Sequence, residues 1–186
     1  ASGENVVERE GLSIRHPAKF VLVGSGNPEE GELRPQLQDR FGLSVDVRTP
    51  SDVPTRVEII RSREAFDKDR GAFRKRWARK ESTLRRRIQR AREALDSVDT
   101  PANLLETAAK LCIALGTDGL RGELTLVRSA RALAALNSDS TATLEHLKTI
   151  APSVLRHRLR RDPLDESSAD IRVERVIAEL FNDCDD

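Results

Sequence analysis

The sequence lacks features that several common classes of protein require. No apolar run approaches the roughly 18 residues that a helix needs to cross a bilayer, and no apolar segment of a secretory signal opens the chain. The two cysteines, Cys112 and Cys184, lie far apart, which predicts free thiols rather than a disulfide framework. The histidines are scattered without metal-ligand spacing, so no metal site is predicted; they are His16, His146 and His157.

Methionine is also absent, which raises the question whether the chain is part of a longer protein. The composition suits a soluble, helix-rich globular protein, because 38% of the residues are hydrophobic and 34% are charged. The net charge is only +1, but residues 61–92 hold fourteen basic and four acidic side chains. Such a stretch is typical of a solvated helix face or a subunit contact, and its alternative interpretation is binding of phosphate backbones.

The first fifty residues predict part of an α/β layer. Residues 5–16 alternate around a polar turn, as a hairpin does. The apolar run 20–23 is typical of a buried parallel strand, the alternating segment 43–47 predicts another strand, and 33–41 is expected to be helical. Because a parallel sheet needs several strands with both faces covered, we expect the rest of this layer to precede Ala1.

The remainder predicts a helical domain in which apolar residues recur at helical spacing. Asp52 or Ser51 is expected to cap its first helix, and Pro152 is expected to kink a later one. The expected helices pass through 57–60 and cover 71–95, 104–115, 124–136, 143–159 and 171–181.

Three polar residues stand where ligands are often bound. Asn27 follows the first apolar run, and its amide can hold a water and a phosphate oxygen together, although Asn27-Pro28 is also a common turn. Arg40 precedes a glycine at the end of a predicted helix, where its guanidinium suits a γ-phosphate or a simple surface ion pair. Arg121 precedes an apolar helix and suits either an anion or a solvated turn. Residues 24–26 form neither a dinucleotide fingerprint nor a P-loop.

Several longer runs of sequence resemble the ATPase (I) subunits of magnesium chelatase, an AAA+ family, through nearly the whole chain. Asp39-Arg-Phe-Gly is shared with many AAA+ proteins, whereas the runs around Asn27 and Arg121 are more specific. The runs are Ala1-Ser-Gly-Glu-Asn-Val-Val-Glu-Arg-Glu-Gly, His16-Pro-Ala, Gly24-Ser-Gly-Asn-Pro-Glu-Glu-Gly-Glu-Leu-Arg-Pro, Asp39-Arg-Phe-Gly, Gly116-Thr-Asp-Gly-Leu-Arg-Gly-Glu-Leu-Thr-Leu and Arg156-His-Arg-Leu-Arg-Arg-Asp-Pro-Leu-Asp.

The resemblance implies an α/β AAA+ core, represented by its C-terminal portion with an inserted β-hairpin, followed by a mainly helical lid. It implies that Asn27 is the sensor-1 residue, Arg40 the arginine finger that acts in trans, and Arg121 the sensor-2 residue that contacts ATP. The expected division is a core segment over 1–60, a basic connecting helix over 61–95 and the lid over 96–186. The Walker A loop and Walker B acidic pair are absent, so the chain alone is expected to be inactive.

The implied activity is the ATP- and Mg²⁺-dependent insertion of Mg²⁺ into protoporphyrin IX for chlorophyll or bacteriochlorophyll synthesis, in bacterial cytoplasm or plastid stroma. The implied partners are further copies in a ring, the D subunit, and the H subunit that binds porphyrin. No nucleic acid and no membrane span are expected. The alternatives are a basic helical nucleic-acid-binding module, which residues 61–92 suggest, and an AAA+ remodelling ATPase with another client.

Overall fold

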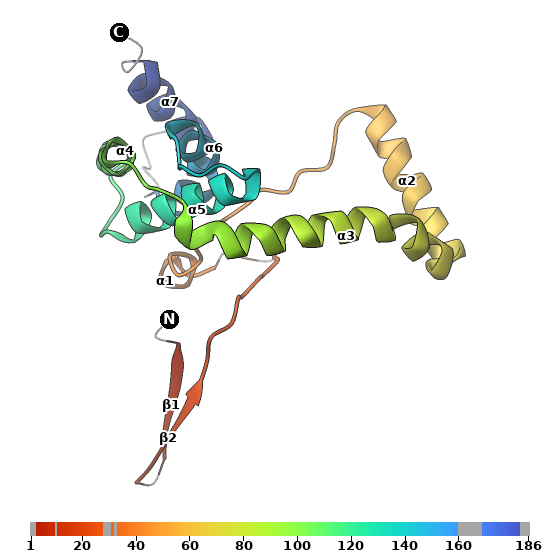
Figure 1. Ribbon diagram of the computed structural model, residues 1–186, viewed down its shortest axis with the longest axis horizontal. Helices are drawn as coiled ribbons and strands as arrows, with labels where there is room; N and C mark the ends of the chain where they lie inside the picture. Colours follow the sequence, from red (N-terminus) through yellow and green to blue (C-terminus); the bar gives the residue numbers. More distant parts are fainter. Residues whose placement is uncertain (1–2, 10, 28–30, 32, 160–168, 183–186) are drawn as a thin grey trace. The chain divides into compact units, whose positions relative to one another are not determined.

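The computed structural model describes residues 3–9, 11–27, 31, 33–159 and 169–182. The chain divides into two compact units, residues 1–34 and 35–186. The first unit contains β1 and β2, and the second contains all of the described helices (Figure 1). The elements are β1 Glu4–Arg9, β2 Leu12–Pro17, α1 Pro35–Gln38, α2 Val53–Lys68, α3 Arg70–Ala94, η2 Leu95–Ser97, α4 Ala102–Ala114, α5 Arg121–Asn137, α6 Leu144–Leu155, η3 Arg156–Arg158 and α7 Ala169–Asn182.

The first unit is built on the predicted hairpin, which is confirmed. Strands β1 and β2 pair antiparallel from Glu4 opposite Pro17 to Arg9 opposite Leu12. Gly11 has φ +83°, a left-handed conformation that glycine adopts without a steric penalty, so it suits the tight turn between the strands. Every residue of both strands is exposed, and a hairpin with neither face covered is marginally stable alone.

The two strands predicted at 20–23 and 43–47 are wrong for this chain. Residues 20–23 and 43–47 form no strand, and Val21 and Val23 are 90% and 89% exposed. Among the described residues the only sheet is the β1–β2 hairpin, so these apolar runs have no neighbouring strands to pair with. The predicted helix over 33–41 is likewise reduced to the single turn of α1.

Two charged helices open the second unit. Asp52 caps α2 by accepting a hydrogen bond from the Thr55 amide at 2.9 Å, as predicted, and Asp69 caps α3 by accepting one from the Ala72 amide at 2.9 Å. Neither helix contains a fully buried residue. Where they meet, the rings of Phe66 and Phe73 lie edge to face at 5.5 Å, and the ring of Trp77 lies 6.0 Å from that of Phe73 at a tilt of 37°.

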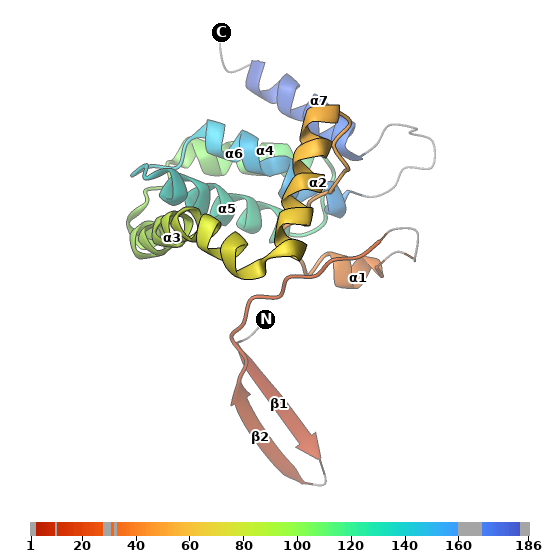
Figure 2. The same ribbon diagram turned by 90° about the vertical axis from the view of Figure 1, so that its right-hand side faces the viewer.

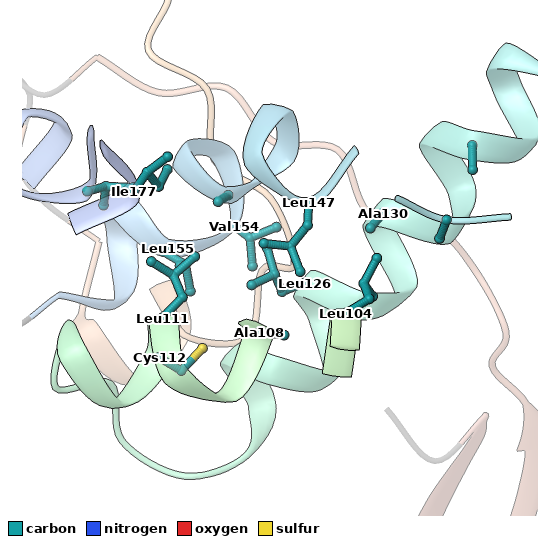
Figure 3. Packing of buried hydrophobic residues seen from close by; sticks show 14 of the residues in the cluster. Leu104, Ala108, Leu111, Cys112, Leu126, Ala130, Leu147, Val154, Leu155 and Ile177 are labelled. Carbon is teal, nitrogen blue, oxygen red and sulfur yellow. The ribbon is translucent and has the colours of Figure 1, made fainter. Parts of the chain in front are cut away.

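The core of the second unit is the bundle of α4, α5, α6 and α7 (Figures 1 and 2). Figure 3 shows side chains of all four helices meeting, among them Leu111 from α4, Leu126 from α5, Leu147 from α6 and Ile177 from α7. Each fully buried leucine contributes about 1.5–3 kcal/mol through apolar burial. The predicted apolar spacing of these helices is therefore confirmed as core packing.

Helix ends within the bundle agree with the sequence signals in most places. Gly116 follows α4 with φ +64°, which ends that helix. The helix predicted over 143–159 ends earlier, at Leu155, and continues as the 3₁₀ turn η3. Pro152 lies inside α6, near its end, where it removes one backbone donor. None of the described helices is long and apolar enough to span a bilayer.

Candidate functional site

A polar cluster that links segments far apart in the sequence forms around Asp39 in the second unit. One carboxylate oxygen, Oδ2, accepts a hydrogen bond from Nη1 of Arg121, the first residue of α5. The other, Oδ1, lies 2.5 Å from Nη1 of Arg158, the last residue of η3. One carboxylate thus joins two arginines from different parts of the lid, and charge-assisted bonds of this kind are stronger than neutral ones.

Local backbone bonds place Asp39 beside the lid. The turn after α1 is closed by hydrogen bonds from the Arg40 amide to the Leu37 carbonyl at 3.0 Å and from the Phe41 amide to the Gln38 carbonyl at 3.1 Å. Farther along, the Ser44 amide donates to the carbonyl of Ser153, inside α6, at 2.8 Å. The segment 37–44 is therefore attached to the lid by its main chain as well as by Asp39.

Arg121 stands at the N-terminus of α5, as the sequence predicted. The N-cap residue, Leu120, offers no side-chain hydrogen bond to the amides of the first turn. Those amides and the helix dipole favour an anion, and the adjacent Arg121 side chain, 55% exposed, adds a full positive charge. Gly122 lets α5 begin close to α4, because a Cβ there would lie 3.3 Å from the Cys112 sulfur.

Arg40 lies between the two residues that the lid holds. Its side chain is exposed, and within the described residues it has no hydrogen bond or ion pair. Asp39 on one side is tied to the two arginines, and the carbonyl of Phe41 on the other accepts hydrogen bonds from Nη2 of Arg158 at 2.8 Å and from Nε2 of His157 at 3.0 Å. An exposed arginine on an anchored segment is well placed to reach a group outside this chain.

Asn27, the third predicted site residue, belongs to the first unit, where its side chain is exposed. Arg40 and Arg121 belong to the second unit, and Asp39 connects their segments. The structure thus brings two of the three predicted residues into one cluster within a unit. The functional roles of all three remain predictions.

Three members of the cluster were not predicted as site residues from the sequence: Asp39, His157 and Arg158. All three lie within runs that carry the family resemblance, Asp39-Arg-Phe-Gly and the run from Arg156, so the signal was present without an assigned role. They come together through contacts between residues 116 to 119 positions apart in the sequence, and the spacing of residues along the chain does not predict such contacts.

Burial changes the protonation behaviour of groups around the cluster. Burial lowers the pKa of His157, and the adjacent charge of Arg158 lowers it further, so the neutral ring is favoured. Because a carbonyl oxygen can only accept, Nε2 carries the proton that His157 donates to Phe41. Burial also lowers the pKa of Arg158, with Asp39 opposing the effect, and raises the pKa of the Cys112 thiol to about 11.

Two other features of the described residues bear on function. No group of three or more His, Cys, Asp or Glu side chains in these parts of the chain could hold a metal ion. The basic helices α2 and α3 carry their cations outward, and some lie over aromatic rings, such as Lys80 at 4.6 Å from the ring centre of Trp77. Cys184 lies outside the described residues.

Comparison with known proteins finds clear relatives. Residues 105–179 match the family model of the AAA lid domain. The chain is 63% identical to the magnesium-chelatase 38 kDa subunit of Acidiphilium rubrum, over 98% of this chain and 53% of that protein. It is 63% identical to the subunit of the same name from Cereibacter sphaeroides (97% and 54%) and 48% identical to the chloroplastic magnesium-chelatase subunit ChlI of Oryza sativa (97% and 44%). The chain spans about half the length of the curated relatives it matches.

Among solved structures, the crystal structure of a proposed ATPase from Cytophaga hutchinsonii is similar to this chain with a TM-score of 0.67. The match covers 93% of this chain and 57% of that one at 17% identity, so it concerns the fold alone. Together these findings confirm the predicted resemblance to magnesium-chelatase ATPase subunits and the predicted AAA+ fold class with its helical lid.

Proposed function

Because this chain is a close relative of the magnesium-chelatase ATPase subunits, we propose that it supplies the trans-acting and nucleotide-sensing half of an AAA+ motor. The motor drives ATP-dependent insertion of Mg²⁺ into protoporphyrin IX, in chlorophyll or bacteriochlorophyll synthesis. The single observation that carries the proposal is the cluster around Asp39, which joins the segment of Arg40 to the start of α5 at Arg121.

In this proposal, Arg121 binds a phosphate oxygen of the ATP held by its own subunit. The uncapped N-terminus of α5 and the exposed guanidinium fit an anion of that kind. A phosphate that approaches Arg121 competes with the Asp39 carboxylate for the same guanidinium. ATP binding is then sensed by the segment 37–44, because Asp39 loses one of its two cationic partners.

Arg40 acts on the ATP of the neighbouring subunit. Phosphoryl transfer to water builds negative charge on the transferred group and the leaving oxygen, and a permanent cation at that point stabilises the transition state. Asn27 orients the attacking water, since its amide can both accept from the water and donate to a phosphate oxygen. Mg²⁺ bound with ATP would neutralise part of the negative charge of the phosphates, and no described residue of this chain is assigned to hold it.

The proposed organisation follows the sequence: a core segment over 1–60, a basic connecting helix over 61–95 and the lid over 96–186. The proposed partners are copies of the same subunit in a ring, the D subunit, and the H subunit that holds the porphyrin. The proposed location is the bacterial cytoplasm or the plastid stroma. We assign the catalytic phosphate-binding loop to another part of the subunit, because residues 24–26 do not form one and this chain spans about half the length of its relatives.

A chimera tests the proposal directly. In the subunit of Acidiphilium rubrum, the segment that matches this chain is replaced by this chain, and the product is assayed with the D and H subunits of that organism. We expect ATP hydrolysis and the fluorescence change of magnesium protoporphyrin formation, both near the levels of the unchanged subunit. A chimera that assembles and hydrolyses ATP but inserts no metal would contradict the client assignment, and one that assembles without hydrolysis would contradict the motor assignment.

A further inference from the structure

We propose that Arg158 is a positioning residue for the arginine finger: its guanidinium grips the main chain on both sides of Arg40 and thereby aims Arg40 at the neighbouring subunit. This inference rests on the proposed function of Arg40. It concerns a residue that neither the sequence motifs nor the comparisons assign, and which lies on η3, far along the chain from the segment it holds.

The geometry around Arg158 is that of a clamp. Nη1 donates to the carbonyl of Asp39 at 3.1 Å and to its carboxylate at 2.5 Å, and Nη2 donates to the carbonyl of Phe41 at 2.8 Å. The two carbonyls belong to the residues immediately before and after Arg40. Nε of the same guanidinium donates to the carbonyl of Val154 in α6 at 3.1 Å, which anchors the clamp to the lid.

The burial of the Arg158 side chain distinguishes this clamp from an ordinary surface ion pair. The side chain of Arg158 is only 4% exposed, against 55% for Arg121, although both bind the same carboxylate. A buried guanidinium is retained only where its charge and its N–H groups are satisfied, and here the carboxylate of Asp39 and three carbonyls satisfy them. These buried contacts therefore hold the segment 39–41 in place.

Arginine suits this role, and lysine does not. Nη1 and Nη2 of the planar guanidinium reach two carbonyls that lie two residues apart, while Nε donates to the carbonyl of Val154. An ammonium group presents its three donors from one point and cannot span the same set of acceptors. A lysine at position 158 would keep the positive charge near Asp39 and lose the simultaneous hold on both flanks of Arg40.

His157 reinforces the clamp from the same turn. Its Nε2 donates to the carbonyl of Phe41 at 3.0 Å, so that carbonyl receives two hydrogen bonds from consecutive residues of η3. The other ring nitrogen, Nδ1, is buried and has no hydrogen-bond partner in the described structure. A buried polar atom without a hydrogen bond is unfavourable. The bond from Nε2 to Phe41 and the packing of η3 hold the ring in place despite this cost.

The consequence is an exposed cation on an anchored backbone. The Arg40 side chain is free to reach outward, while its main chain is held on both sides by the lid. Catalytic groups lose much of their effect when misplaced by about 1 Å, and a loss of roughly a hundredfold is typical. Since η3 follows α6 directly, the clamp makes the aim of Arg40 depend on the position of the lid.

The test uses mixed rings of a full-length subunit that contains this chain. One subunit carries a substitution in its phosphate-binding loop and supplies only the finger, and the other carries Arg40→Ala and supplies only the pocket. Arg158→Lys is placed in either subunit in turn. Arg128→Lys, an exposed arginine of α5 outside the cluster, is the matched control.

We expect Arg158→Lys in the finger donor to lower kcat roughly tenfold or more with the KM for ATP unchanged. The same substitution in the pocket donor should leave kcat within about twofold. Hydrogen exchange of the chain itself should show faster exchange of the Arg40, Phe41 and Ser44 amides in Arg158→Lys, with the amides of α4 and α5 unchanged. Arg128→Lys should change none of these.

Equal losses from both placements, or faster exchange throughout the lid, would show a merely structural arginine and overturn the inference. Unchanged activity and unchanged exchange in Arg158→Lys would overturn it as well, while leaving the finger role of Arg40 intact. Wild-type hydrolysis by rings made only of Arg40→Ala subunits would instead overturn the proposed function on which the inference rests.

Discussion

Asp39 and Arg121 lie 82 positions apart in the sequence, yet the carboxylate of one accepts a hydrogen bond from the guanidinium of the other. Asp39 is the residue immediately before the proposed finger, and Arg121 is the proposed sensor of the subunit's own nucleotide. In the proposed function, this contact joins the residue that senses the subunit's own ATP to the segment that carries the finger for the neighbouring ATP. Both side chains are about half exposed, which keeps the pair open to a competing phosphate.

The first prediction concerns Arg121. In a full-length subunit, Arg121→Ala should change the free energy of unfolding by less than about 1 kcal/mol, because an exposed ion pair contributes little and Asp39 keeps its bond to Arg158. Hydrolysis should fall roughly tenfold to a hundredfold, since a charge-assisted phosphate contact is lost. Steady-state kinetics and urea unfolding measure the two effects, with Arg128→Ala as control. Unaltered kinetics would contradict the sensor role and leave Arg121 with its ion pair to Asp39 alone.

The second prediction is a pH dependence. Burial lowers the pKa of His157 from its ordinary value of 6.5, so as the pH falls the unfolded chain takes up a proton before the folded one. The contribution of His157 to stability is therefore complete above about pH 6.5, declines below it, and stops declining once the pH is under the folded pKa.

His157→Gln should remove this part of the pH dependence, because an amide can still donate to the carbonyl of Phe41 but does not titrate. Urea unfolding of both proteins at several values between about pH 5 and about pH 8 measures the difference. Parallel stability curves for the two proteins would show that His157 is not held neutral by the fold.

Much of the helical unit was predictable from the sequence, because its signals are local. Apolar residues at helical spacing identified α4 and α5, and Asp52 was one of the two residues expected to cap α2. The apolar run 20–23 and the alternating segment 43–47 have the local patterns of strands but form none, because a strand exists only beside its neighbours in a sheet. A local sequence pattern does not show whether neighbouring strands are present.

The candidate site was predictable only in part. Arg40 and Arg121 were singled out from their places beside glycines and helix ends and from the resemblance. The clamp was not, since Arg158 meets Asp39 across 119 positions and nothing in the spacing of the two residues signals the contact. The lid must fold before that arrangement exists, and the arrangement is a property of packing rather than of any motif.

The third prediction concerns the buried thiol. Burial raises the pKa of Cys112 from 9.0 to about 11, and the residue is 1% exposed. In a Cys184→Ser variant, alkylation of the folded chain by iodoacetamide should be at least roughly a hundredfold slower than that of a free thiol, because the thiolate is scarce and covered. Mass spectrometry over time measures the rate, which should rise to the free-thiol value in denaturant. Rapid labelling of the folded chain would contradict the observed packing around Leu111 and Cys112.

The fourth prediction addresses the basic helices α2 and α3. Their cations face outward, but the stretch has no recognisable nucleic-acid motif, so binding to DNA or RNA should be weak and independent of sequence. Fluorescence anisotropy with labelled oligonucleotides should show affinity that falls steeply with salt and disappears near about 150 mM. A submicromolar complex that persists at that salt concentration would favour the nucleic-acid-binding alternative.

The most direct test of the account is the hydrolysis of ATP by mixed rings that contain Arg40→Ala. An arginine finger acts on charge that develops in the transition state and contributes roughly 10³–10⁵ in rate, so full-length Arg40→Ala should bind ATP and assemble but hydrolyse poorly and insert no metal. Mixing it with a subunit whose phosphate-binding loop is disabled should restore part of the activity, because one subunit then supplies the pocket and the other the finger. Activity measured across mixing ratios should pass through a maximum, with the melting temperatures of all variants unchanged. Wild-type hydrolysis by Arg40→Ala alone, or a lowered melting temperature with no recovery at any ratio, would contradict the trans-acting role of Arg40.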